Sequence, residues 1–511
     1  MCTPTRGQLM TGLDCLRNGA MNVSSGRALL RRGLPTMATL FSAAGYRTGQ
    51  FGKWHLGDNY PYRPQDRGFE ETLSFPSSHV GSAPDFFQND YFHDTYSHNG
   101  VRKQSDGYCT DVFFQAAMTW MKGCAAKQEP FLCFLATNAP HGPLFVPAEY
   151  RSAYAGQPDQ VARFLGMLAN IDDNMGRLDK FLNDGGLARD TILIFLTDNG
   201  GTAGTAIFNA GLRGKKMALY DGGHRVPCFI RWPGGNLRSP GDIAELTQVQ
   251  DLLPTLLDLC GVSSVGAAFD GISLAPLLRD TSAALPDRTL VVQFSRMNDP
   301  KPKQGDACVL WKKWRLVSDR ELYDVAHDRQ QATNVIDQHP EIAASLRTYY
   351  DRWWRGVSQR IDERESIVIG SDAENPLLLS PVDWEDVFFD QGAQVRQGLR
   401  RNGHWNVEVA RAGSYEFTLR RWPVESDQPI TAGIPVLKHD DGEFPLGVAL
   451  PIASARLTVG STHVEKRVEM NDKAIVFNIV LPVGRTLVRT AFLDGNDAEI
   501  AGAYYVTVRR K

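Results

Sequence analysis

The stretch Cys2-Thr3-Pro4-Thr5-Arg6-Gly7-Gln8-Leu9-Met10-Thr11-Gly12 decides how the chain begins to fold. Proline fixes φ near the helical value and lacks an N–H that would have no partner in a first helical turn, so we expect a helix to begin at Pro4 or Thr5. Cys2 then lies just before that turn, where free amides favour an anion, and Arg6 can direct its guanidinium back towards residue 2. The stretch therefore predicts a seat for a nucleophile. The alternative is a cysteine and an arginine that merely begin a surface helix.

This stretch resembles the first signature of the sulfatases, C-x-P-S/T-R-x-x-x-L/M-T-G, in which the cysteine is oxidised to formylglycine. Cys2, Pro4 and Arg6 stand at the positions that the formylglycine-generating enzyme reads in that family, so the resemblance implies this enzyme as a transient partner. The second family signature follows as residues 45–57, GYRTGQFGKWHLG. With both motifs in the family's order, the chain is identified as a member of the sulfatases, within the alkaline phosphatase superfamily.

The start of the sequence differs from this pattern. Relatives in the family carry a strand before the cysteine that ends in a pair of acidic metal ligands, and the sequence shows no such strand. We therefore expect the metal site of the chain as written to lack two neutralising ligands. The expected consequences are weak calcium binding and slow turnover.

Length and charge limit the classes of function. The 511 residues exceed what a single hydrophobic core organises, so we expect two or three domains. The formal net charge of -3 argues against a general affinity for nucleic acid. No run of about 18 apolar residues predicts a membrane span, and the eight cysteines lack the spacing of a metal site. The resemblance, and no feature of the composition, implies a periplasmic or secreted protein.

Lys53 and His55 lie within the second signature. In extended backbone, residues i and i+2 share a face, so both side chains can point into one pocket while Trp54 packs behind them. The resemblance implies that Lys53 clamps the sulfate and that His55 assists the nucleophile.

Residues 58–108 are rich in proline, glycine, aspartate and serine, which is typical of loops over the rim of a site. Within them, Phe75-Pro76-Ser77-Ser78-His79 is similar to an arylsulfatase stretch, which implies that Ser78 binds the sulfate. A plain loop serine is the alternative. The loop histidines are expected to be solvated, with substrate contact as the alternative: His79, His93 and His98.

Two continuous apolar runs, residues 131–136 and 191–196, predict strands buried on both faces of a sheet. Open α/β sheets place ligands at the carboxyl ends of strands, where His141 and the pair Asp198-Asn199 follow. Carboxylate and amide oxygens suit a hard divalent cation, although Asp-Asn-Gly is also a common turn. The resemblance implies that His141 contacts the leaving alcohol and that Asp198 and Asn199 bind calcium together with residue 2.

Residues 213–227 resemble the family block K-x-x-x-W/Y-E-G-G-x-R-V-P. Lys216 aligns with the lysine that holds the sulfate, and Lys215 is expected to be its solvated neighbour. Asp221 stands where the family usually has glutamate.

The predicted fold class is α/β, with a mixed central sheet flanked by helices, a small antiparallel subdomain and a separate β-sandwich. The resemblance implies a sulfatase catalytic domain over residues 1–262, truncated at its start, and a carboxyl-terminal subdomain over residues 263–360. Short strands of alternating hydrophobicity predict the β-sandwich over residues 361–511. Its tryptophans could form a sugar platform, with core packing as the plainer account: Trp384, Trp405 and Trp422.

Together these features predict a hydrolase that cleaves sulfate esters of a glycan or an aryl alcohol. The implied nucleophile is formylglycine at residue 2, supported by Arg6 and a calcium ion. Two alternatives remain open at this point. One is a phosphonate or phosphate diester hydrolase of the same superfamily, and the other is a catalytically inactive remnant that binds glycans.

Overall fold

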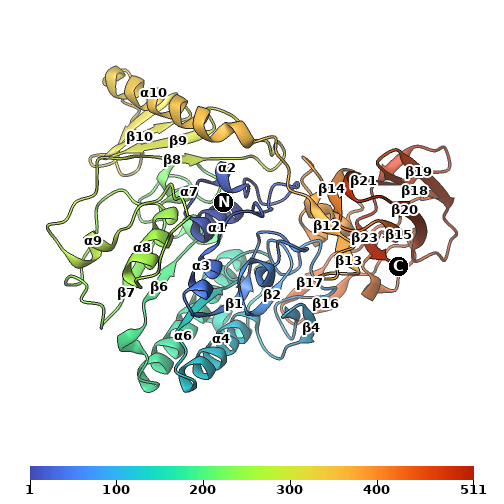
Figure 1. The fold of residues 1–511 in the computed structure, drawn as a ribbon, viewed down its shortest axis with the longest axis horizontal. Coiled ribbons are helices and arrows are strands. Elements are labelled where there is room, and N and C mark those ends of the chain that lie inside the picture. Colours follow the sequence, from blue (N-terminus) through green and yellow to red (C-terminus); the bar gives the residue numbers. More distant parts are fainter.

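The computed structural model describes residues 1–511, with an α/β part followed by an all-β part (Figure 1). A five-stranded sheet in the α/β part has the order β4-β3-β2-β1-β5. Its strands are β1 (Arg47–Lys53), β2 (Glu71–Phe75), β3 (Thr95–His98), β4 (Val101–Gln104) and β5 (Phe131–Ala136). β1 pairs in parallel with β2 and β5, whereas β3 pairs antiparallel with both β2 and β4. The α/β class and the mixed sheet expected from the sequence are observed.

Helices cover both faces of this sheet. One face packs on α4 (Cys109–Ala126) and α6 (Asp159–Asp184), and the other packs on α1 (Cys2–Thr11), α3 (Met37–Ala43) and α8 (Leu252–Leu259). Along β5 the contacts alternate with the two-residue period of a strand. Phe131 packs towards α4 and α6, whereas Leu132 packs towards α1, α3 and α8. The remaining short helices are α2 (Cys15–Asn18), α5 (Ala148–Ser152), α7 (Asp221–His224), α9 (Ala275–Arg279) and α11 (Gly392–Arg396).

The strand that precedes Asp198 does not join the central sheet as expected. β6 (Leu193–Leu196) pairs antiparallel with β7 (Cys228–Arg231) in a separate two-stranded sheet. Each of β5 and β6 has a strand partner on one edge only, and for that reason most of their apolar side chains are half-buried instead of buried.

A second, antiparallel sheet follows in the order β11-β10-β9-β8. Its strands are β8 (Thr289–Gln293), β9 (Ala307–Trp311), β10 (Trp314–Val317) and β11 (Glu321–Asp324). One face packs on the amphipathic helix α10 (Pro340–Val357), whose Leu346 and Tyr350 share a core with Val309 and Leu316.

The all-β part contains two sheets around one core of 38 buried residues, to which the α/β part contributes Leu29, Tyr62 and Ala83. The first has the order β12-β14-β21-β18-β19, with β22 beside β21, and the second has the order β13-β23-β15-β20. The strands of the first sheet are β12 (Ile367–Ile369), β14 (His404–Val409), β18 (Ser454–Val459), β19 (Thr462–Arg467), β21 (Gly484–Leu493) and β22 (Glu499–Ala501). Those of the second are β13 (Leu377–Leu379), β15 (Gly413–Arg420), β20 (Ile475–Leu481) and β23 (Tyr505–Arg510).

The three tryptophans considered for a sugar platform are core residues. Trp384, Trp405 and Trp422 are buried in the shared core, and the indole N–H of Trp405 donates to the carbonyl of Ser380. None of them presents a ring face to solvent, so the plainer account from the sequence is the correct one.

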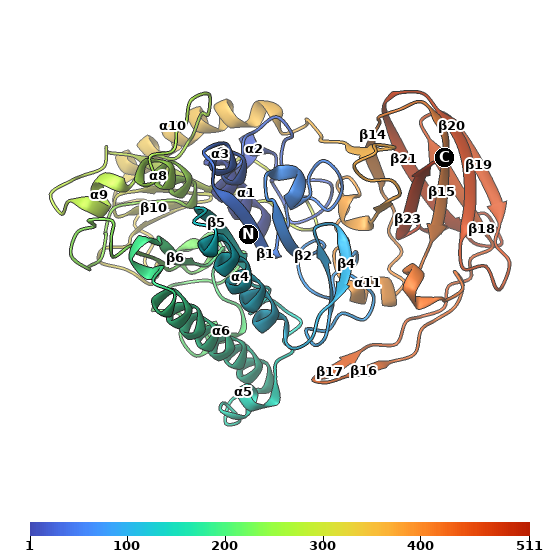
Figure 2. The same cartoon turned by 60° about the horizontal axis from the view of Figure 1, so that its bottom comes forward.

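A hairpin leaves these sheets and reaches back to the α/β part. It consists of β16 (Leu437–His439) and β17 (Gly442–Phe444), which Figure 2 shows extended away from the other strands of the all-β part. The Asp441 carboxylate at its tip accepts hydrogen bonds from the Val146 amide and the Arg151 guanidinium, both at 2.8 Å. The hairpin therefore fixes the loop that runs from His141 to Val146.

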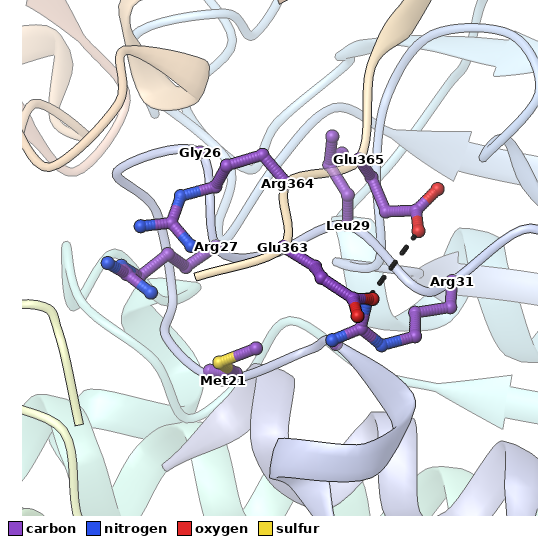
Figure 3. Close-up of a pocket in the computed structure, with 9 residues that line it drawn as sticks. Met21, Gly26, Arg27, Leu29, Arg31, Glu363, Arg364 and Glu365 are labelled. Atoms are coloured by element: carbon purple, nitrogen blue, oxygen red, sulfur yellow. Dashed lines mark hydrogen bonds and ion pairs between the residues drawn. The ribbon is translucent and has the colours of Figure 1, made fainter. Parts of the chain in front are cut away.

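Buried arginines join the beginning of the chain to residues 361–365. Figure 3 shows Arg31 beside Glu363 and Glu365, with Arg31 Nη1 at 3.0 Å from Glu363 Oε2, and Arg27 Nη1 donates to the carbonyl of Ile361 at 3.2 Å. The pocket between them encloses about 10 Å³, which is close to the space of one water molecule. It is a packing gap at the junction and not a ligand site.

No helix of the structure combines the length and the hydropathy required to cross a bilayer.

Candidate active site

Residue 2 lies at the amino end of α1, where the candidate site is centred. The helix begins at Cys2 itself, slightly earlier than expected, and ends at Gly12 in the left-handed conformation with φ 67°. Cys2 is 2% exposed, and its Sγ lies 3.4 Å from Asn199 Oδ1 and 3.6 Å from Lys216 Nζ. Burial alone raises the pKa of this thiol, but Lys53 and Lys216 together hold the pKa below its usual value. A nucleophile at this position is stabilised as an anion.

Asp198 and Asn199 follow β6 and meet the first turn of α1. The Thr5 hydroxyl donates to the carbonyl of Asp198 at 2.8 Å, and Arg6 Nε lies 3.4 Å from Asp198 Oδ2. Burial raises the pKa of the Asp198 carboxyl, but Arg6 and the two site lysines outweigh it and hold the pKa well below its usual range. Asp198 is therefore a carboxylate at neutral pH.

The turn after Asn199 requires a glycine. A Cβ on Gly200 would lie 1.9 Å from the carbonyl oxygen of Gly222, closer than any non-bonded contact allows. This close approach holds Asp198 and Asn199 against α7, and the Lys216 amide donates to the carbonyl of Gly201 at 3.0 Å.

Lys53 is the last residue of β1 and reaches the same centre. Arg6 Nη1 donates to its carbonyl at 2.7 Å, which ties the strand end to α1. The residue before it, Gly52, has φ 98°, and a Cβ there would lie 2.1 Å from the Ala136 carbonyl oxygen. Burial lowers the pKa of the Lys53 ammonium, although the Cys2 thiol works in the opposite direction.

His55 is buried next to Lys53 in a left-handed backbone conformation, with φ 61°. Its Nε2 lies 2.8 Å from the carbonyl of Val23, so Nε2 carries the proton and donates. Its Nδ1 has no hydrogen-bond partner and is sealed from solvent. Burial and Lys53 lower the pKa of this histidine well below 6.5. His55 thus keeps an unprotonated nitrogen without a partner at Nδ1, and Trp54 packs in the neighbouring core.

His141 follows β5 and belongs to a pair of stacked histidines. Its Nδ1 lies 2.7 Å from the Gly142 carbonyl, so Nδ1–H donates there and Nε2 is the free nitrogen. Its ring stacks on that of His79, with the centroids 5.0 Å apart. Burial lowers the pKa of His141 well below 6.5, and Lys53, Lys216 and His79 lower it further. The ring is neutral beside two lysines.

Ser78 is hydrogen-bonded within the protein. Its Oγ lies 2.8 Å from each carboxylate oxygen of Asp390 and 2.6 Å from His79 Nδ1. A serine hydroxyl has one proton. Here that proton makes the hydrogen bond to the Asp390 carboxylate. The sulfate-binding role expected for Ser78 does not fit this geometry, because the hydroxyl has no proton left to donate to a sulfate oxygen.

Asp390 lies beside the site and was missed by the sequence analysis, which named substrate contact for His79 only as the alternative to a solvated ring. His79 was expected to be solvated, and it is 5% exposed; the expectation was wrong because Asp390 and Ser78 enclose it. His93 and His98 do lie nearer the surface, and a ring nitrogen of each lies 2.6 Å from an acidic side chain, Asp106 and Glu71 respectively. The serine before His79 was the one available signal. Nothing in the sequence connects Asp390, 312 residues later, to that serine.

Two lysines of adjacent positions differ as expected. Lys216 is half-buried with its ammonium at Cys2, and Lys215 is exposed. Asp221, where the family usually has glutamate, forms a buried ion pair with Arg315 and a second ion pair with the half-exposed Arg225. Its role in this structure is to hold α7 against β10.

The donors around residue 2 fit calcium in kind but are few. Asp198 and Asn199 would hold the ion with an oxygen on residue 2, and Asn199 Oδ1 already faces that residue. Calcium takes about six to eight oxygen ligands. The chain brings together no group of three or more His, Cys, Asp or Glu side chains placed to hold a metal. The single carboxylate Asp198 is also shared with Arg6.

The chain resembles known proteins in sequence. Residues 1–262 match the family model described as Sulfatase, and residues 211–352 match the model described as N-sulphoglucosamine sulphohydrolase, C-terminal. N-acetylgalactosamine-6-sulfatase of Mus musculus is 27% identical over 306 residues, which cover 54% of this chain and 57% of the relative. Arylsulfatase A of Homo sapiens is 30% identical over 316 residues, 55% of this chain and 59% of the relative. The chain thus spans less than two thirds of the length of these relatives.

Solved structures share the fold. One is described as Ps i-CgsB in complex with k-i-k-neocarrahexaose, with a TM-score of 0.61, 22% identity, and coverage of 70% of this chain and 87% of that chain. Another, described as a complex with its substrate D-Glucosamine-2-N, 6-O-disulfate, has a TM-score of 0.55, 18% identity, and coverage of 71% and 90%. Because the family model covers more than half of the 511 residues, the chain belongs to the sulfatase family.

Proposed function

We propose that this chain carries the active site of a sulfuric ester hydrolase that acts on a sulfated glycan or an aryl sulfate. The observation that carries the proposal is the position of residue 2. Its side chain lies at the first turn of a helix, between Asn199 Oδ1 and Lys216 Nζ, with the Asp198 carboxylate beside Arg6. This is an anion seat with a metal-ligand pair on one side and a cation on the other.

The proposed nucleophile is formylglycine made from Cys2 by a formylglycine-generating enzyme. The hydrated aldehyde supplies two hydroxyl groups, one to attack sulfur and one to expel the sulfate afterwards. Calcium, held by Asp198 and Asn199, would make an oxygen on residue 2 a stronger nucleophile at neutral pH. The 3.4 Å contact of Cys2 Sγ with Asn199 Oδ1 supports this assignment.

The chain's own residues provide binding and proton transfer. Lys53 and Lys216 clamp the sulfate and offset the charge that spreads over its oxygens in the transition state. Arg6 keeps Asp198 ionised and oriented, through the contact at 3.4 Å. His55 accepts the proton from residue 2 at Nδ1, its unpartnered nitrogen.

His141 is assigned to the leaving alcohol, which it protonates from Nε2. The ring is neutral in the ligand-free site because burial lowers its pKa, and Lys53 and Lys216 lower the pKa further. A bound sulfate monoester places negative charge between these groups, which raises the pKa of the ring and favours the protonated form. Substrate binding therefore charges the acid that the reaction requires.

The domain organisation is part of the proposal. Residues 1–262 form the catalytic domain and residues 263–360 the small antiparallel subdomain. Residues 361–511 form a β-sandwich, which the two sheets and their common core support. A periplasmic or secreted location is proposed from the family resemblance alone. All eight cysteines are free, so no disulfide bears on the location.

Parallel assays test the reaction class. The full chain, produced together with a formylglycine-generating enzyme, is offered 4-nitrophenyl sulfate and bis(4-nitrophenyl) phosphate at equal concentration. We expect turnover of the sulfate ester to exceed that of the phosphate diester. A preference for the diester would assign the site to phosphoryl transfer. Glycan binding without turnover by aldehyde-containing chain would indicate the inactive remnant.

A further inference from the structure

We propose that His79 is a specificity-determining residue: through Nε2 it accepts a hydrogen bond from a hydroxyl or amide N–H on the alcohol part of the sulfate ester, and Asp390 and Ser78 position it. This inference rests on the proposed sulfatase function and extends it to the substrate class, a polyol sulfate.

The first support is the proton count along three side chains. The Ser78 hydroxyl uses its one proton to donate a hydrogen bond to the Asp390 carboxylate, since both carboxylate oxygens lie 2.8 Å from Oγ. The 2.6 Å contact between Ser78 Oγ and His79 Nδ1 then requires a proton on Nδ1. In a neutral ring this leaves Nε2 with a free lone pair. The relay fixes the tautomer of His79.

The second support is the surroundings of Nε2. This atom makes no hydrogen bond in the protein, and unlike His55 Nδ1 it is not sealed from solvent. The ring lies parallel to His141, at an interplanar angle of 24°. His141 is the residue assigned to the leaving oxygen, so an alcohol held there places its neighbouring groups at His79.

The third support is charge. Burial, with contributions from Lys53 and Lys216, lowers the pKa of His79 to about 4, although Asp390 works in the opposite direction. The ring is therefore neutral at pH 7 and can only accept at Nε2. The two lysines also disfavour a cationic group on the substrate. A neutral donor beside the ester, such as a sugar hydroxyl or an amide N–H, satisfies both conditions.

The positioning group comes from the all-β part of the chain. Asp390 is 6% exposed, its carbonyl accepts from the Ala83 amide at 2.8 Å, and its amide donates to Gln394 Oε1 at 2.8 Å. Ser77 Oγ adds a third hydroxyl contact to the carboxylate, at 3.1 Å. Asp390 is held on several sides, so residues 361–511 contribute to the substrate pocket.

Two small esters isolate the proposed contact. Catechol monosulfate carries a hydroxyl next to the sulfate ester, and phenyl sulfate lacks it. The specificity ratio is defined as kcat/KM for catechol monosulfate divided by kcat/KM for phenyl sulfate, measured as sulfate release by the full chain. His79→Phe keeps a stacking ring and removes the acceptor. We expect it to lower the ratio by about five- to tenfold, the weight of one neutral hydrogen bond.

Further variants separate positioning from folding. His79→Gln restores an acceptor oxygen near the place of Nε2 and is expected to recover most of the ratio. Asp390→Ala is expected to lower the ratio as well, with a larger change in KM than in kcat, because it frees the tautomer. His93→Phe, a change at an exposed loop histidine, is the matched control and leaves both rates unchanged. Melting temperatures show that each variant is folded.

A ratio that stays within about twofold of wild type in His79→Phe would overturn the inference. If no sulfate is released from either ester, the proposed function fails, and the inference is then tested by affinity. The Cys2→Ala chain should bind catechol monosulfate more tightly than phenyl sulfate by calorimetry, and His79→Phe should abolish that difference. Equal affinities in the Cys2→Ala chain would contradict the inference independently of turnover.

Discussion

Replacing Lys216 by glutamine tests the sulfate clamp most sharply, because its neighbour Lys215 provides a matched control. Lys216 Nζ lies 3.6 Å from Cys2 Sγ, whereas Lys215 is exposed and contacts nothing in the site. At an effective dielectric constant of about 20, two unit charges about 4 Å apart interact by about 4 kcal/mol. Lys216 is half-buried, so solvent screens part of this interaction.

We expect Lys216→Gln to lower kcat/KM for 4-nitrophenyl sulfate by about 10²- to 10³-fold, the range found when one charge-stabilising donor is removed from an active site. Lys215→Gln is expected to stay within about threefold of wild type, since exposed charges contribute little. The assay is initial-rate hydrolysis on protein in which conversion of residue 2 has been measured by mass spectrometry. Similar losses in both variants would refute the assignment of Lys216 to the sulfate, as would a loss below about tenfold in Lys216→Gln.

Two further predictions concern charge in the buried parts of the structure. Burial and the nearby Asp58 raise the pKa of Asp383 to about 8 from 3.8. Between these two values the folded chain holds a proton that the unfolded chain releases. The free energy of unfolding should therefore fall as pH rises from about 4 to about 8. Asp383→Asn should flatten this dependence by at least about 1.4 kcal/mol, the equivalent of one pKa unit, in denaturant melts at pH 5 and pH 8; identical slopes for both proteins would contradict it. Residues 1–511 offer calcium one carboxylate and one amide oxygen beside residue 2. Calorimetry should therefore give a dissociation constant for calcium weaker than about 10⁻⁴ M. Submicromolar binding would show that the donor set is larger than these residues.

The local features of the site could be predicted from the sequence because each depends on a short stretch of chain. Proline near the start of a helix placed Cys2 at an amino end, and α1 begins there. Apolar runs ending in His141 and in Asp198 predicted strands that deliver these residues, and β5 and β6 do so. The residues of three motifs meet in the fold, since Cys2 Sγ contacts both Asn199 and Lys216.

The features that were missed depend on contacts between distant residues. The pairing of β6 with β7 could not be read from an apolar run, because such a run shows burial but not which strand is the neighbour. His79 looked like a solvated loop residue because the carboxylate that encloses it arrives from the all-β part. The hairpin that holds the His141 loop through Asp441 is equally remote in sequence.

The central claim is that residue 2, once it is an aldehyde, performs the chemistry between Asn199 and Lys216. The most direct test measures the fraction of chains with the aldehyde, by mass spectrometry of the peptide that contains residue 2, against the rate of sulfate release over a series of preparations with different conversion. The account predicts a rate that rises in proportion to the converted fraction and vanishes in Cys2→Ala. Sulfate release by Cys2→Ala at the rate of the converted chain would contradict it.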